Sequence, residues 1–85
     1  MKPHIKNYMK EHGYEPGDWI PCQVCGATST DIHHVVYKSQ QGKDTADNLI
    51  ALCRHHHDQA HFKKEPYLKQ EELKEIVNLH LKTKQ

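Results

Sequence analysis

The feature that most constrains this chain is a stretch at residues 53–61 that carries one cysteine and four histidines. Neither solubility nor packing requires this density of metal-ligating side chains. At about 100° per residue, a helix here would place Cys53 and His56 on one face. His57 and His61 would share a neighbouring face, and His55 would point away from both pairs. We therefore predict one short helix that serves two different metal ions; the alternative is a solvent-exposed, histidine-rich turn.

The cysteine count favours metal binding. The chain has 85 residues, 35% of them hydrophobic, so its core must be thin, and a chain this short usually needs a cross-link. Its three cysteines cannot all pair, but three thiolates and one imidazole complete a tetrahedral zinc site. We predict a structural zinc held by Cys22, Cys25, Cys53 and His56 that supplies much of the folding free energy. No βαβ pattern surrounds the C-x-x-C pair, which disfavours a redox role.

Charge and hydropathy exclude several classes of protein. The formal net charge of +1 is not that of a strongly basic nucleic-acid binder, so local charges and bound metal must supply any positive potential. No apolar stretch is long enough to span a membrane, and the Met-Lys-Pro-His start lacks the apolar region of a secretory signal. We expect a cytoplasmic protein in a reducing compartment.

Helices are predicted near both ends of the chain, which we expect to form a single domain over residues 1–85. Residues 3–12 read as a short helix, because Pro3 suits a first helical position and Gly13 can cap the end. Residues 67–82 read as an amphipathic helix with apolar residues along one side, namely Leu73, Ile76, Val77 and Leu81.

Between these helices the pattern predicts a core at residues 20–62 made of a β-hairpin and the histidine-rich helix. Residues 31–37 and 48–52 are the predicted strands, joined by a polar loop. Trp19 and Ile20 are expected to cover the core beside the zinc, and Phe62 is expected to be buried. The predicted fold class is therefore α+β, a small zinc-stabilised domain with flanking N- and C-terminal helices.

The first strand carries a doubled histidine. Successive side chains on a strand point to opposite faces, so His33 and His34 must lie on opposite sides of the sheet. The two imidazoles therefore cannot do the same job.

In order, the residues form one constellation: Cys22-x-x-Cys25, Asp31-x-His33-His34, Asn48, and Cys53-x-x-His56-His57-x-x-x-His61. This constellation resembles the HNH endonucleases, whose ββα-metal (His-Me finger) motif is named for a histidine, an asparagine and a histidine. Within that group it is similar to the zinc-stapled, treble-clef type. The resemblance covers roughly residues 20–62, and the spacing of the last two histidines is also similar to that of colicin-type nuclease domains.

The resemblance implies a role for each matching residue. His34 corresponds to the general base that activates water, and His33, His57 and His61 correspond to ligands of a catalytic divalent metal. Asn48 corresponds to the asparagine that holds the hairpin loop and orients the base. Neutral imidazole, with an unperturbed pKa of ~6.5, can accept a proton at neutral pH.

The chain departs from the commonest form of the motif at two positions. His56 stands where a cysteine is more usual, and His33 stands where many members carry an aspartate. Three imidazoles favour a transition ion such as Mn²⁺, Ni²⁺, Co²⁺ or Zn²⁺ as the catalytic metal, although Mg²⁺ is still compatible.

The predicted function is a metal-dependent HNH endonuclease that hydrolyses phosphodiester bonds in DNA. Its contacts with the nucleic-acid backbone are expected from basic residues around the hairpin and helix, namely Arg54, Lys38, Lys43, Lys63 and Lys64. Nothing resembles a base-reading recognition helix, so low sequence specificity is expected, and a protein partner could direct so small a domain to its target.

A second interpretation is a non-catalytic zinc module that binds nucleic acid or a protein partner. The predicted structural zinc alone is compatible with that module, but the second set of histidines is not needed for it. A metal-buffering protein explains neither Asn48 nor the doubled histidine in a strand. The residues do not distinguish DNA from RNA, or nicking from double-strand cleavage.

Overall fold

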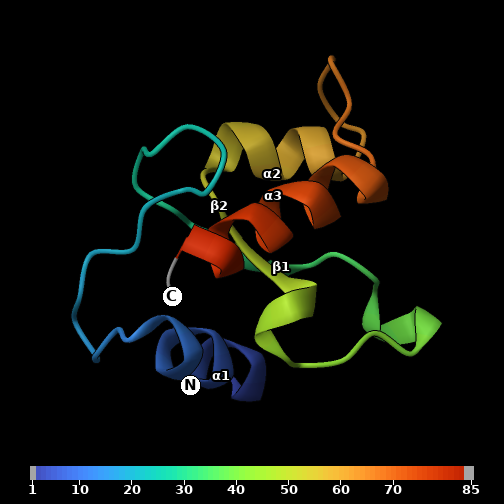
Figure 1. Cartoon of the computed structure of the whole chain (residues 1–85). Helices are drawn as coiled ribbons and strands as arrows, with labels where there is room; N and C mark the ends of the chain where they lie inside the picture. The colour runs from blue at the N-terminus through green and yellow to red at the C-terminus, as the bar shows by residue number, and fades with distance from the viewer. Residues whose placement is uncertain (1, 84–85) are drawn as a thin grey trace.

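In a computed structural model that describes residues 2–83, a two-stranded antiparallel sheet lies between helices (Figure 1). Short 3₁₀ turns fill part of the connection between the two strands. The elements in chain order are α1 (Pro3–His12), β1 (Asp31–His34), the turns Lys38–Gln40 and Ala46–Asn48, β2 (Leu49–Leu52), α2 (Arg54–Ala60) and α3 (Gln70–Thr83).

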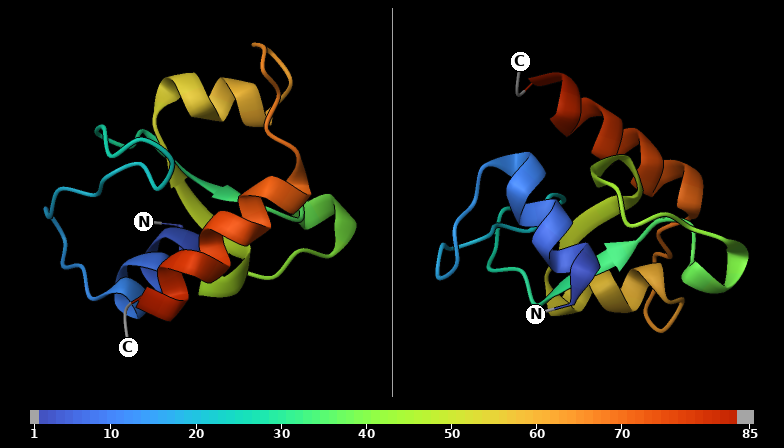
Figure 2. Two further views of the ribbon diagram at one scale, coloured as in Figure 1. Left: turned by 45° about the horizontal axis from the view of Figure 1, so that its top comes forward. Right: turned by 90° about the horizontal axis from the view of Figure 1, so that it is seen from below.

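Both faces of β2 are buried, because helices pack on each side of the hairpin. Leu49 and Ala51 face one side and pack with Tyr8 of α1. Ile50 and Leu52 face the other side, where the larger cluster gathers Cys22, Val35, Ala60 of α2, and Leu73 and Val77 of α3. Figure 2 shows α3 running close to β2 and the turn before it. An isolated two-stranded hairpin is marginal in water, so this two-sided cover stabilises it.

The first helix spans Pro3–His12 and ends at Gly13, which adopts a left-handed conformation with φ 77°. The last helix begins at Gln70, three residues later than the pattern predicted. The chain before it has no regular secondary structure, and the backbone N–H of Leu68 donates to the carbonyl of Gln59 at 3.1 Å. That bond ties the segment before α3 to the end of α2.

The first strand is shorter than predicted and ends at His34 rather than at residue 37. Beyond His34, the side chain of Asn48 makes the backbone hydrogen bonds that a neighbouring strand would otherwise make. Its amide oxygen accepts from the N–H of Val36 at 2.8 Å, and its amide nitrogen donates to the Val36 carbonyl at 3.1 Å. The sheet ladder therefore stops where the amide side chain satisfies the backbone, and the second strand starts only at Leu49.

The predicted burial of two aromatic residues is wrong. Trp19 is 61% exposed, and its neighbour Ile20 packs with the Tyr8 cluster, not beside the cysteines. Phe62 is 53% exposed because α2 ends just before it. The Phe62 backbone is left-handed, with φ 60°, and Lys63 N–H donates to the Asp58 carbonyl at 2.8 Å. This helix-ending motif turns the Phe62 side chain towards solvent.

No helix among residues 2–83 has the length and apolar character needed to cross a membrane.

Two leucines on α3 provide a matched test of this packing. Leu73 is 1% exposed and Leu79 is 62% exposed. We expect Leu73→Ala to lower the free energy of unfolding by about 2–5 kcal/mol, because it leaves a cavity in the core. Leu79→Ala should change it by less than about 0.5 kcal/mol. Urea denaturation of the metal-loaded protein measures both, and equal losses would contradict the packing of α3 described here.

Candidate metal centres

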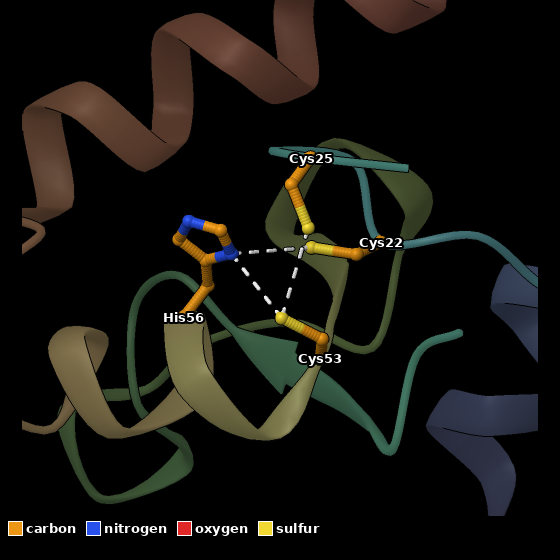
Figure 3. A group of neighbouring side chains, drawn as sticks. All are labelled: Cys22, Cys25, Cys53 and His56. Carbon is orange, nitrogen blue, oxygen red and sulfur yellow. Dashed lines mark hydrogen bonds between the residues drawn. The ribbon is translucent and has the colours of Figure 1, made fainter. Parts of the chain in front are cut away.

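Four metal-ligating side chains converge where the loop before β1 meets the start of α2 (Figure 3). Cys22 and Cys25 come from the loop, and Cys53 and His56 from the first turn of the helix. Their ligand atoms all lie within 4.8 Å of one another. The Cys25 and Cys53 sulfurs are 3.8 Å apart, and Cys22 Sγ is 3.8 Å from His56 Nδ1. A tetrahedron with zinc–sulfur bonds of about 2.3 Å has edges of about 3.8 Å, so the cluster fits zinc.

Local backbone structure brings these ligands together. Gly26 has φ 82° and its N–H donates to the Cys22 carbonyl at 2.8 Å, which closes the turn around the first two cysteines. Cys53 directly precedes α2, so His56 lies one turn further along the same side of that helix. All three cysteines are free thiols. Glycine adopts this positive φ without steric cost, because it has no Cβ.

The electrostatics of His56 and Cys22 in this cluster suit a bound cation. Burial lowers the pKa of His56, which keeps its imidazole neutral and its lone pair available. Burial raises the pKa of the Cys22 thiol, but hydrogen bonds from the backbone at Cys53, Cys25 and Val24 outweigh it and leave the pKa below its usual value. Both effects favour the protonation states that bind metal.

Three histidines form a second cluster. His33 comes from β1, and His57 and His61 come from α2 and the residue that ends it. The Nε2 atoms of His57 and His61 are 3.0 Å apart, and the His33 ring is edge-on to both, with centroid distances of 5.4 Å and 4.9 Å. Three imidazoles from two elements thus converge on one point, as the spacing of the helix pair and the position of the strand histidine predicted.

Burial makes His33 a good ligand. Its side chain is 5% exposed, and burial, followed by the proximity of His61 and His57, lowers its pKa to about 4. Burial also lowers the pKa of His57. These imidazoles are neutral at pH 7, so a metal need not displace a proton from them. Such a nitrogen-rich set suits a transition ion.

A carboxylate to which the sequence assigned no role supports this cluster. Asp31 Oδ2 lies 3.2 Å from His57 Nδ1, while His57 Nε2 faces His61. A metal-ligating histidine commonly donates its other ring N–H to a carboxylate, which fixes the tautomer and the ring orientation. Asp31 and His33 are two residues apart on a strand and therefore share a face. The alternation of side chains along the strand is the sequence pattern that could have indicated a role for Asp31 beside His33.

The other strand histidine has a different partner. His34 Nε2 lies 2.7 Å from Asp44 Oδ1, and Lys38 Nζ lies 3.0 Å from Asp44 Oδ2. The hydrogen bond with His34, followed by that with Lys38, lowers the pKa of Asp44. The His4 ring of α1 lies against His34, with centroids 4.6 Å apart. No sequence pattern marks Asp44, because it reaches His34 through the fold of the connecting loop.

Asn48 holds that loop and lies outside the histidine cluster. Besides its two bonds to Val36, its amide nitrogen donates to the Lys43 carbonyl at 2.8 Å. Gly42 lies inside the loop, where an added Cβ would overlap the Val36 carbonyl. Together these residues position the segment that carries Lys38 and Asp44.

One cavity of about 250 Å³ joins both faces of β1. The cavity extends to both faces of β1 because one edge of this strand is unpaired in the two-stranded sheet. Its lining includes the three clustered histidines, His34, and several residues that flank them: Lys2, His4, Asp31, Ile32, Tyr37 and Lys38.

Only one of the five predicted backbone-binding residues lines this cavity. Lys38 does so, whereas Arg54, Lys43, Lys63 and Lys64 are exposed elsewhere. The sequence analysis missed Lys2 and His4, since the first turn of α1 is far from the motif along the chain.

The hairpin, the histidine-rich helix and the Cys3His cluster define a small α+β domain of the ββα type, with a ligand set that fits zinc. Residues 22–63 match the family described as HNH endonuclease. This segment of the chain therefore matches the HNH endonuclease family, and the predicted resemblance is confirmed.

One curated relative is the type IV methyl-directed restriction enzyme EcoKMcrA of Escherichia coli (strain K12). It is 34% identical to this chain over 53 residues. The match covers 51% of this chain but 19% of the relative, so this chain corresponds to a small part of that enzyme. No solved structure matches the chain significantly.

The two clusters predict different behaviour of two bound ions. Chelation of the ion at the Cys3His cluster should abolish the cooperative thermal transition, because that ion links the loop to α2. His57→Ala should reduce metal content from two ions per chain to one and leave the far-UV spectrum unchanged. Equilibrium dialysis with Co²⁺ and elemental analysis measure the ratio.

The matched control is His55→Ala, because His55 lies on the same helix but in neither cluster. It should keep both ions. A wild-type ratio that never exceeds one ion, or a chelated protein with an unchanged melting curve, would contradict the assignment.

Proposed function

We propose that this protein is a metal-dependent endonuclease that hydrolyses phosphodiester bonds in DNA. The observation that carries the proposal is a cavity lined both by the three-histidine cluster and by His34, whose Nε2 lies 2.7 Å from Asp44 Oδ1. A bound metal and a separate general base are the two components that hydrolysis of a phosphodiester requires. A structural metal module alone needs neither.

His34 is the proposed general base. Asp44 accepts the hydrogen bond from Nε2–H, which leaves Nδ1 as the nitrogen with the lone pair. In this arrangement Nδ1 takes the proton from the attacking water. Asp44 holds the ring in the correct tautomer and stabilises the imidazolium that forms, while Lys38 keeps the carboxylate ionised.

His33, His57 and His61 are the proposed ligands of the catalytic ion, with Asp31 orienting His57. When bound, a divalent ion supplies Lewis-acid stabilisation of the charge that develops on the phosphate. The ligand set favours Mn²⁺, Ni²⁺, Co²⁺ or Zn²⁺ over Mg²⁺. Lys2 and Lys38 add positive charge at the cavity edge for the nucleic-acid backbone.

DNA is the proposed substrate class. The match to an endonuclease family and similarity to part of a restriction enzyme support DNA over RNA. Backbone contacts dominate the proposed interface, so sequence specificity from this domain is low.

The general base is tested with plasmid DNA and protein supplied in turn with Mg²⁺, Mn²⁺, Ni²⁺, Co²⁺ and Zn²⁺. His34→Ala should cut the cleavage rate by about 10²–10⁴-fold, with metal content and DNA affinity near wild type. His55→Ala should cleave normally. If wild type binds DNA but cleaves with none of these ions, the protein is a binding module instead.

The positioning role of Asp44 is tested by a double-mutant cycle. Asp44→Asn should slow cleavage by less than His34→Ala does, without loss of metal. Because Asp44 acts through the imidazole, the double variant His34→Ala/Asp44→Asn should be no slower than His34→Ala alone. Additive losses would show that Asp44 acts independently of His34.

A further inference from the structure

A second, larger cavity opens beside the first. It has a volume of about 580 Å³ and is formed by the start of α1 together with residues 18–20 and 28–32. In Figure 1 this loop segment runs outward on one side of the sheet from the end of α1. The two cavities share four lining residues, Lys2, His4, Asp31 and Ile32. The larger cavity therefore adjoins the proposed catalytic one.

The most exposed apolar side chain in this cavity is an indole. Trp19 is 61% exposed, and its Nε1 donates to Thr28 Oγ1 at 3.0 Å. That bond satisfies the polar atom and holds the ring on the loop. A large aromatic surface held in place and left in water is typical of an interaction site.

The rest of the lining complements the indole. Three half-buried isoleucines, Ile5, Ile20 and Ile32, supply apolar surface, and Ile20 and Ile32 belong to the cluster under the sheet. Lys2 lies where the two cavities meet. The arrangement is a flat aromatic ring beside apolar side chains in a cavity whose lining also includes the carboxylates of Asp18 and Asp31, with a cation where it meets the proposed phosphodiester site. It fits a nucleotide, whose base is flat and apolar on its faces and whose phosphate is anionic.

We propose that this cavity binds an unpaired nucleobase of the DNA strand, stacked on Trp19, next to the phosphate to be cleaved. The proposal rests on the nuclease function proposed above. A base is joined to its phosphate through one sugar, so adjoining cavities are what the two groups of a nucleotide require. A paired base inside a duplex has its faces covered by its neighbours, so the bound base must be extruded or single-stranded.

This site determines the preferred form of substrate. Stacking tolerates every base, because each has a π face, so it adds affinity without a sequence code. The nuclease should therefore cut single-stranded or gapped DNA faster than a fully matched duplex. The preference should disappear when the indole is removed.

Trp19 is the single tryptophan of the chain, so indole fluorescence, excited selectively over that of the tyrosines, reports on this cavity. Metal-loaded His34→Ala protein, which is expected to bind without cutting, is titrated with a single-stranded oligonucleotide. We expect quenching of the indole. An abasic strand of the same length and charge should not quench, and should bind about 5- to 150-fold more weakly.

Substitutions separate stacking from other roles. Trp19→Ala should weaken binding of the oligonucleotide by a similar factor but leave the abasic strand unaffected, and Trp19→Phe should recover most of the loss. Tyr67→Ala is the matched control, because Tyr67 is an exposed aromatic outside both cavities and should change nothing. Metal content and the far-UV spectrum check that each variant is folded.

The outcomes distinguish the two proposals. Equal binding of the base-containing and abasic strands, or full affinity in Trp19→Ala, would overturn the nucleobase site and point to a protein contact for the indole. Cleavage by wild type with such a result leaves the nuclease function intact. Conversely, base-dependent quenching in a protein that cuts nothing would support the nucleobase site and reject only the nuclease.

Discussion

The convergence of Cys22, Cys25, Cys53 and His56 is the constraint on which the rest of the structure depends. It joins a loop without regular secondary structure to the first turn of a seven-residue helix, α2. Neither segment would keep its position through propensity, because helices this short are marginal alone. Since His57 directly follows His56, the same cross-link sets the direction in which the second pair of helix histidines points. The fold and the candidate active site therefore share one anchor.

The small width of the two-stranded sheet is the second feature on which the candidate site depends. In a wider sheet, residues on opposite faces would be separated by neighbouring strands. Here β1 has a free edge, so His33 and His34 face opposite ways and still line one cavity. His33 is buried among imidazoles, whereas His34 pairs with a carboxylate. Two histidines in different chemical surroundings can thus line one cavity because the sheet that carries them is narrow.

Asn48 links backbone architecture to this chemistry. Its side chain satisfies both backbone groups of Val36 and the carbonyl of Lys43, and so it ends the first strand and closes the loop that delivers Asp44. The resemblance implied two roles for this asparagine, loop-holding and orientation of the base. The contacts support the first directly, and they place Asp44 as the direct partner of His34.

Much of the fold was accessible from local patterns. The α+β class and the order of hairpin and helix follow from strand alternation and helix periodicity, which act over a few residues. The HNH family was indicated by the resemblance of the ordered cysteines, histidines and asparagine to its motif. Errors arose where tertiary contacts override composition. Hydrophobicity alone predicted burial of Trp19 and Phe62, but a hydrogen bond from the indole and a left-handed backbone at the helix end leave both in solvent.

The sequence by itself determined which side chains lie together on one element: Cys53 with His56, His57 with His61, and His33 opposite in direction to His34. Backbone geometry sets those relations at short range. Only the tertiary structure decided which groups meet across elements. Asp44 reaches His34, and Lys2 and His4 reach the strand from α1, because of how a loop and a helix pack. The position of the Trp19 cavity beside the histidines was decided in the same way, since contacts between distant segments carry no local signature in the chain.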